Sequence, residues 1–187
     1  MRYPILFILL AAVPLLHGCP VMVATGVGGA LAAGEDPRTI GTITEDEGIE
    51  LKAEQRISQK YPESHVNVTS YNRMVLLTGE ASDETTRGGI ESAARAVENV
   101  RGVYNEIAVA GVSSLTSRTN DTLLTTKVKA GFVNSKEVDS LHIKIVTEAG
   151  VVYLFGLVKH KEADAATEIA RTTSGVRKVV KLFEYLD

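Results

Sequence analysis

One pattern of short β-rich segments occurs twice in the chain, and this internal repeat constrains the fold more than any other feature. Residues 66–70 and 74–79 form the first pair of segments, and residues 143–147 and 151–156 repeat them 77 positions later. A polar or glycine-containing stretch of three residues separates the members of each pair, which predicts two β-hairpins. The repeat therefore indicates two copies of one small unit, each with a modest core of its own.

Each hairpin is flanked by segments that predict helices and a further strand. After the first hairpin, Asp83 can cap a helix whose apolar residues recur at helical spacing, namely Ile90, Ala93, Ala94 and Val97. The remaining predicted elements are helices at 47–60, 121–134 and 162–173 and closing strands at 103–109 and 176–186. Each copy is thus an α+β unit of order αββαβ, in which a small three-stranded mixed sheet packs against two helices.

Four glycines stand where we expect a structural role rather than a ligand. Gly79 and Gly156 lie late in the second strand of each hairpin, where glycine indicates a bulge or a close approach by neighbouring backbone. Gly102 and Gly175 follow the helices that come after the hairpins, and glycine at such a place commonly ends a helix.

A stretch rich in serine and threonine, residues 111–120, separates the copies and places the domains at 45–112 and 113–187. The first domain has seven Lys/Arg and twelve Asp/Glu, a net charge of −5, and the second has eleven and nine, a net charge of +2. This asymmetry makes the second domain better suited to an anionic surface. The overall charge of −3 argues against a dedicated nucleic-acid-binding protein.

The N-terminus has the form of a lipoprotein signal peptide, which we place at 1–18. Its apolar run, residues 5–16, is long enough for a signal peptide and too short to span a bilayer. The single cysteine, Cys19, follows in Leu16-His17-Gly18-Cys19, which resembles the lipobox in which cysteine is acylated and begins the mature chain. His17 departs from that pattern, because small or aliphatic residues are usual there.

An alternative to acylation is cleavage near Ala32-Ala33, which would discard Cys19. If Cys19 is retained, several acyl chains on one residue suffice for stable anchoring. Pro20 follows it, rather than the aspartate that often retains lipoproteins in the inner membrane, so we expect the outer membrane. Residues 19–44 are then predicted to form the lipidated cysteine and a flexible tether.

The repeated unit resembles the BON domain. The matching motifs run from the tether to the C-terminus and are Asp36-Pro37-Arg38, Gly41-Thr42, Val103-Tyr104-Asn105-Glu106-Ile107, Asn120-Asp121-Thr122, Thr125-Thr126-Lys127-Val128 and Gly156-Leu157-Val158. With the lipobox and tether, the chain is similar to the dual-BON outer-membrane lipoproteins of Gram-negative bacteria. The resemblance implies a non-enzymatic protein that faces the periplasm, binds anionic phospholipid such as phosphatidylglycerol through its second domain and supports outer-membrane integrity. It also implies association with the β-barrel assembly machinery and with division sites.

The helix predicted at 121–134 has a face suited to lipid. At 100° per residue, its core side holds Leu124, Val128, Gly131 and Phe132, and its outer side holds Leu123, Thr126, Lys127, Ala130, Val133 and Asn134, with Lys129 between the two. Apolar groups flanked by lysines are typical of a surface that enters an anionic headgroup layer. Single exposed leucine and valine residues are also common without any role. The predicted phospholipid-binding residues are Leu123, Lys127, Ala130 and Val133, although the family often has tryptophan where Leu123 stands.

No pattern in the sequence predicts a catalytic, cofactor or metal site. Nucleophile-elbow, zinc-protease and phosphate-loop motifs are missing. His65 and His142 take equivalent places before the two hairpins, so they belong to different domains and are not expected to share a metal ion. We therefore expect a non-enzymatic protein without a cofactor.

Two functions remain open. In the first, the chain is a membrane-surface module whose second domain engages anionic phospholipid. In the second, it is a protein-interaction adaptor in which a BON sheet or the acidic first domain docks an outer-membrane assembly or division machine. A soluble periplasmic stress protein is a third and weaker reading, which acylation of Cys19 would eliminate.

Overall fold

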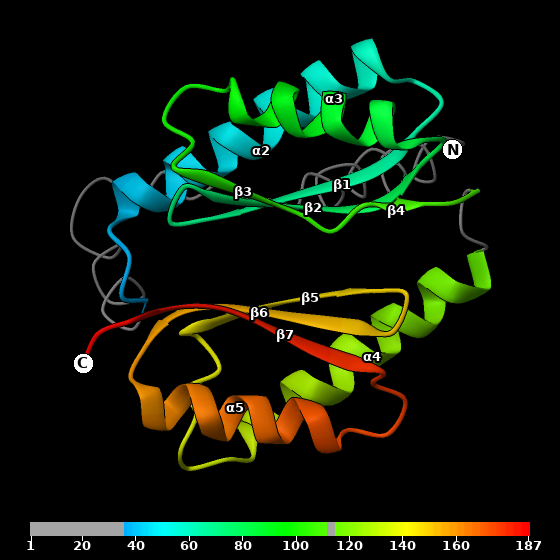
Figure 1. Ribbon diagram of the computed structural model, residues 1–187. Helices are drawn as coiled ribbons and strands as arrows, with labels where there is room; N and C mark the ends of the chain where they lie inside the picture. The colour runs from blue at the N-terminus through cyan, green and yellow to red at the C-terminus, as the bar shows by residue number, and fades with distance from the viewer. Residues whose placement is uncertain (1–35, 112–114) are drawn as a thin grey trace, which may run out of the picture. The chain divides into compact units, whose positions relative to one another are not determined.

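The computed structural model describes residues 36–111 and 115–187, without the side chains of 115–117. The predicted signal peptide, Cys19 and most of the predicted tether lie outside these residues. Residues 33–187 form one compact unit. Within it, each copy of the repeat has the predicted α+β fold (Figure 1).

The first domain contains α2 (Ile40–Lys60), β1 (His65–Tyr71), β2 (Met74–Ala81), α3 (Glu84–Arg95), β3 (Gly102–Asn105) and β4 (Ala108–Val109). Strand β1 is antiparallel to β2, and β3 and β4 run parallel to β2 on its other side. Both helices lie on one face of this sheet (Figure 1). Ile49, Ala53 and Ile57 recur at helical spacing along α2 and are buried in the core that the helices share with the sheet.

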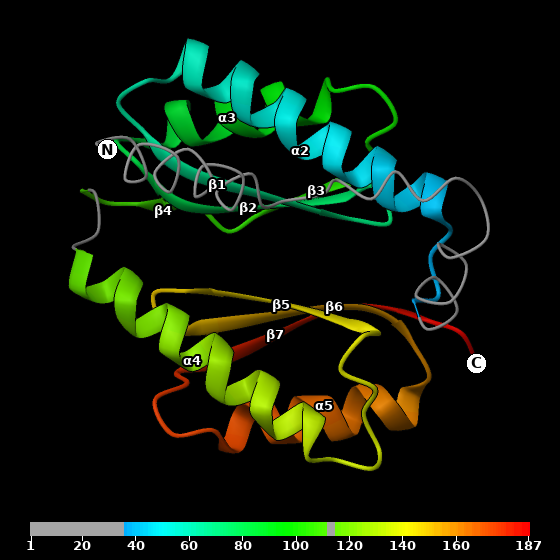
Figure 2. The ribbon, with the colours of Figure 1, turned by 180° about the vertical axis from the view of Figure 1, so that it is seen from behind.

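The second domain repeats this plan with α4 (Leu115–Val133), β5 (Ile143–Glu148), β6 (Val151–Val158), α5 (His160–Thr172) and β7 (Lys178–Tyr185). Strand β5 is antiparallel to β6, and β7 is parallel to β6 along its full length. Figure 2 shows α4 and α5 on one face of this sheet. Val128 and Phe132 of α4 meet Ala163 and Ala166 of α5 in one buried core.

The boundaries of two helices and one strand differ most from the sequence prediction, and those of α5 and β7 differ by one or two residues. Helix α2 begins at Ile40 rather than at residue 47, because the side chain of Thr39 accepts a hydrogen bond from Thr42 N and caps it. The prediction of a flexible tether up to residue 44 is therefore wrong for its last residues. Helix α4 begins at Leu115 rather than 121, which shortens the predicted linker. The closing strand of the first domain is interrupted at 106–107, where Ile107 turns its side chain into the core at 3% exposure.

Both hairpin turns have two residues rather than the predicted three. Asn72 and Arg73 have φ of 50° and 64°, and Ala149 and Gly150 have φ of 48° and 75°. Two consecutive positive φ values define the tight turn whose twist matches that of paired strands. Three of these four residues are not glycine, so the turns need support from elsewhere in the fold.

The four glycines occupy crowded or left-handed positions. A Cβ on Gly79, whose φ is +110°, would lie 2.1 Å from the carbonyl oxygen of His65, and one on Gly156 would lie 2.9 Å from that of His142. Gly175 follows α5 with φ of +101°. Gly102 does not end a helix, because α3 stops at Arg95; it is the first residue of β3 and packs closely against Met74.

Candidate functional site

The outer face of α4 carries all four residues predicted to contact phospholipid. Leu123 is 56% exposed and Val133 is 64% exposed, and Lys127 and Ala130 are exposed between them. The predicted core residues of the helix lie on its other side, where Leu124, Val128 and Phe132 are at most 1% exposed. The amphipathic pattern of this segment therefore set the orientation of the helix correctly.

Two polar contacts hold α4 against its own hairpin. The carboxylate of Asp121, which is 5% exposed, accepts hydrogen bonds from Ala149 N at 2.9 Å and Gly150 N at 2.8 Å. Thr125 Oγ1 donates to Thr147 Oγ1 of β5 at 2.8 Å, or accepts from it. These contacts and the buried core side fix the rotation of the helix, so its outer apolar groups cannot turn inward.

Positive charge on this face is available for a ligand. In the described part of the chain, Lys127 and Lys129 form no ion pair with a carboxylate, whereas Lys144 pairs with Glu50 at 2.8 Å. Lys129 also borders an open hollow of about 490 Å³ along α4, lined with Ala130 and Val133. The face combines exposed apolar groups with two ammonium groups that have no carboxylate partner in the described residues. This combination suits a ligand that is partly apolar and negatively charged.

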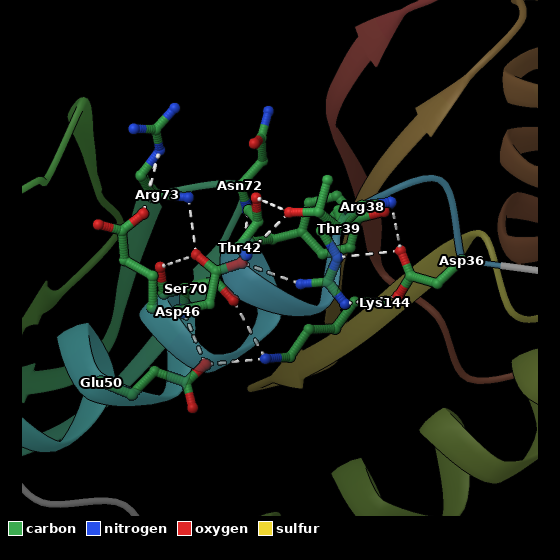
Figure 3. Close-up of polar contacts among 12 residues, drawn as sticks. Asp36, Arg38, Thr39, Thr42, Asp46, Glu50, Ser70, Asn72, Arg73 and Lys144 are labelled. Atoms are coloured by element: carbon green, nitrogen blue, oxygen red, sulfur yellow. Dashed lines mark hydrogen bonds and ion pairs between the residues drawn. The ribbon is translucent and has the colours of Figure 1, made fainter. Parts of the chain in front are cut away.

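A second feature, which the sequence analysis missed, is a buried aspartate in the first helix of each domain. Asp46 is 3% exposed, and its carboxylate accepts from Asn72 N at 2.8 Å, Arg73 N at 2.7 Å and Ser70 Oγ at 2.7 Å (Figure 3). Asp121 does the same for the turn of the second domain. These two carboxylates supply the support that the left-handed turn residues need. The sequence did contain a signal for these buried carboxylates, because an aspartate stands in the same part of the first helix of both copies.

The segment before α2 is bound to this cluster. Arg38 Nη1 donates to Asp46 Oδ2 at 3.0 Å, and its guanidinium lies 3.9 Å from the ring centroid of Tyr71. Arg38 also donates to Asp36 (Figure 3). Burial alone would raise the pKa of Asp36, but the hydrogen bonds from Arg38 outweigh it and lower that pKa. Residues 36–38 are therefore part of the folded unit.

An apolar cluster joins the two sheets. Its buried members are Tyr71, Leu76, Tyr153, Phe155 and Leu182. The rings of Tyr71 and Phe155 stack with centroids 5.9 Å apart, and Tyr71 Oη donates to His142 O at 3.1 Å. Burial raises the pKa of Tyr71 to about 12. Each sheet therefore has helices on one face and this cluster on the other.

The two equivalent histidines have separate partners. His65 Nδ1 lies 3.1 Å from Glu80 Oε2, and His142 Nδ1 lies 3.2 Å from Glu162 Oε1. Within the described ranges, no group of three or more histidine, cysteine or acidic side chains is arranged to hold a metal ion. Over the same residues, no helix has both the length and the apolar character needed to cross a membrane.

Comparison with known proteins identifies the repeated unit. The BON domain family matches residues 45–111 and 120–187. The chain is 39% identical over 185 residues to the outer membrane lipoprotein DolP of Haemophilus influenzae, which covers 97% of this chain and 96% of that protein. It is 34% identical over 154 residues to the 21 kDa hemolysin of Actinobacillus pleuropneumoniae, covering 81% and 79%. It is 27% identical over 145 residues to osmotically-inducible protein Y of Escherichia coli, covering 75% and 72%.

Each of the two matched ranges contains one repeated unit of the structure except the first five residues of its first helix. The similarity to the outer membrane lipoprotein DolP extends over almost the full length of both chains. This chain therefore belongs to the BON domain family, as a DolP-like protein with two BON domains.

Proposed function

We propose that this chain is a non-enzymatic envelope lipoprotein that binds anionic phospholipid through the outer face of α4 and supports outer-membrane integrity. An acyl anchor on Cys19 holds it at the outer membrane, facing the periplasm. The similarity to an outer membrane lipoprotein of Haemophilus influenzae supports the location. The lipid anchor rests on the lipobox-like sequence that ends at Cys19.

One observation carries the lipid-binding role: α4 is fixed in rotation, yet it exposes more than half of Leu123 and Val133 beside two lysines without an ion pair in the described residues. Burial of exposed apolar side chains at the headgroup boundary favours binding, and each lysine near an anionic leaflet adds about 1 kcal/mol. The net charge of +2 on the second domain acts in the same direction.

The test is flotation of residues 33–187, the compact unit without the anchor, with vesicles rich in phosphatidylglycerol. Leu123→Asp places a charge where an apolar group should enter the bilayer, so we expect it to abolish flotation while circular dichroism stays unchanged. Leu51→Asp is the matched control, because Leu51 is also a leucine on a helix surface and is 67% exposed on α2 of the first domain.

Wild type and the Leu51 variant should float with anionic vesicles, less so at raised salt, and neither should float with purely zwitterionic vesicles. Failure of the wild type to float would overturn the lipid-binding role and leave membrane residence to Cys19 alone.

A protein-interaction adaptor is the second candidate, and an apolar hollow on the first domain favours it. This hollow of about 410 Å³ is lined with Leu51 and Ile57 of α2 and Val66 of β1, in the domain whose net charge is −5. A partner such as the β-barrel assembly machinery would be retained by the Leu123→Asp variant and lost by Leu51→Asp. Leu123→Asp is thus the disruptive variant in the flotation assay and the control for partner binding, and Leu51→Asp is the reverse.

A further inference from the structure

The loop between α4 and β5, residues 134–142, exposes a large apolar side chain. Leu141 is 55% exposed, close to the 56% of Leu123. The other aliphatic residue of this loop, Val138, is 6% exposed and packs into the core of the second domain. One apolar side chain of the loop thus anchors it, and the other faces solvent.

Hydrogen bonds hold the loop in place around Leu141. Leu141 N donates to Asp139 Oδ1 at 3.0 Å, and Asp139 N donates to Glu162 Oε1 of α5 at 2.9 Å. His142 N donates to Asp139 O at 3.1 Å, and its ring nitrogen Nδ1 contacts the same oxygen of Glu162. The backbone on both sides of Leu141 is therefore fixed, and the exposed position of the side chain is a property of the fold.

Lys129 connects Leu141 with the outer face of α4. It lines the hollow that contains Ala130 and Val133, and it also lines a second hollow of about 320 Å³ that contains Leu141. The hollow of Val133 and the hollow of Leu141 therefore share one lysine, which has no carboxylate partner in the described residues.

Arg38 lines this second hollow as well, two residues after the start of the described chain. The segment that leads back toward Cys19 consequently joins the folded unit on the side where Leu141 lies.

We propose that Leu141 is a second apolar contact of the lipid-binding surface, so that Leu141 and the outer face of α4 enter the headgroup layer beside Lys129, whose ammonium group pairs with lipid phosphate. This inference rests on the proposed function and extends it from one helix to a helix and a loop. Asp46, Glu47 and Glu50 line the second hollow too; Asp46 is paired with Arg38 and Glu50 with Lys144.

The chain contains no tryptophan, so a single introduced tryptophan reports its own surroundings. We would prepare residues 33–187 with Leu141→Trp, Leu123→Trp or Leu51→Trp, and record emission with vesicles of phosphatidylglycerol that contain brominated acyl chains. The emission of the indole at 141 and at 123 should shift to shorter wavelength and be quenched by bromine, and the indole at 51 should show neither effect.

In the same vesicles, Leu141→Ser should weaken binding about tenfold, because the apolar burial of the leucine side chain is lost. Leu51→Ser should leave binding unchanged.

The outcomes separate this inference from the function on which it rests. A shift at 123 without a shift at 141 overturns the role of Leu141 and leaves α4 as the contact. If the indole shifts neither at 123 nor at 141, the proposed function and this inference are both overturned. A shift at 51 equal to that at 141 shows unspecific adsorption and also overturns the assignment.

Discussion

At the scale of residues, two buried aspartates do the same work in the two domains. Asp46 and Asp121 each accept two backbone N–H bonds from a hairpin turn, and Asp46 accepts two further bonds from side chains. A carboxylate at this point offsets the cost of left-handed backbone at residues such as Arg73 and Ala149. The helix, the turn and the register of the hairpin are thereby coupled through one side chain.

We expect Asp46→Asn to lower the free energy of unfolding by about 2–3 kcal/mol, because the amide brings a donor to a site that needs four acceptor contacts. Asp121→Asn should cost less, since it replaces an acceptor of two bonds. Urea unfolding of both variants measures the difference. Asp164→Asn, at an exposed position of α5, is the control and should change stability by at most about 0.5 kcal/mol. Equal losses in all three variants would contradict the support of the turns.

The buried phenol of Tyr71 predicts a loss of stability in alkali. Its pKa in the folded chain is raised from 10.0 to about 12, mainly by burial. An unfolded chain ionises this group first, so the stabilisation is fully present below pH 10 and is lost as the pH rises toward 12. Tyr71→Phe has no phenol to ionise. Over this pH range its free energy of unfolding should therefore fall by roughly 1–2 kcal/mol less than that of the wild type. Urea unfolding as a function of pH tests this, and identical slopes in both proteins would refute it.

At the scale of elements, the second strand of each hairpin passes very close to the first. Gly79 combines left-handed φ with a Cβ position only 2.1 Å from a backbone oxygen, and backbone cannot move aside as a flexible side chain does. The glycine therefore permits the strand register that places His65 opposite Glu80. Elsewhere glycine has the opposite effect, because in the interior of α2 its freedom only weakens the helix.

Gly79→Ala should destabilise the first domain by more than about 2 kcal/mol, since it adds both steric overlap and left-handed strain. Gly48→Ala is the matched control in α2, where a Cβ would meet nothing within 4 Å. That variant should raise stability by about 0.5–1 kcal/mol. Thermal unfolding of the two proteins gives the sign of each effect. A neutral Gly79→Ala would show that the strands can separate at this point without cost.

At the scale of the whole folded unit, the two domains share an apolar cluster in addition to their separate cores. Phe155 is 1% exposed, stacks on Tyr71 and contacts the ring of Tyr104. Polar contacts between the domains surround the cluster, among them Lys144 with Glu50 and Arg101 with Glu184. We therefore expect the domains to unfold together.

Phe155→Ala should cost about 3–5 kcal/mol and resolve the single calorimetric transition of the wild type into two, because it removes an aromatic ring that is 1% exposed in the shared cluster. Val138→Ala truncates a core residue that belongs to the second domain alone, so it should lower the melting temperature without separating the transitions. Two transitions in the wild type itself would show that the shared cluster does not couple the domains.

Local sequence patterns determined which helices and strands each domain contains. The repeated hairpin and helical spacings predicted two αββαβ units, and the 3.6-residue period of α4 separated buried Leu124 from exposed Leu123. Such patterns work because they depend on residues only a few positions apart. They set helix ends less well, since α2 and α4 begin earlier than predicted. The roles of Cys19 and of the lipid-facing residues remain predictions.

Only the tertiary structure showed what joins distant parts of the chain. The buried roles of Asp46 and Asp121, the stacking of Tyr71 on Phe155, and the hollow that Lys129 and Leu141 share each depend on the folded arrangement. No periodicity in the sequence encodes these contacts, because their partners lie on different elements and their separation in the chain differs from case to case. The sequence by itself therefore determined which elements form and which sides of them are apolar. The tertiary structure decided which of those sides meet one another and which remain exposed to solvent, because burial depends on the packing of all the elements together.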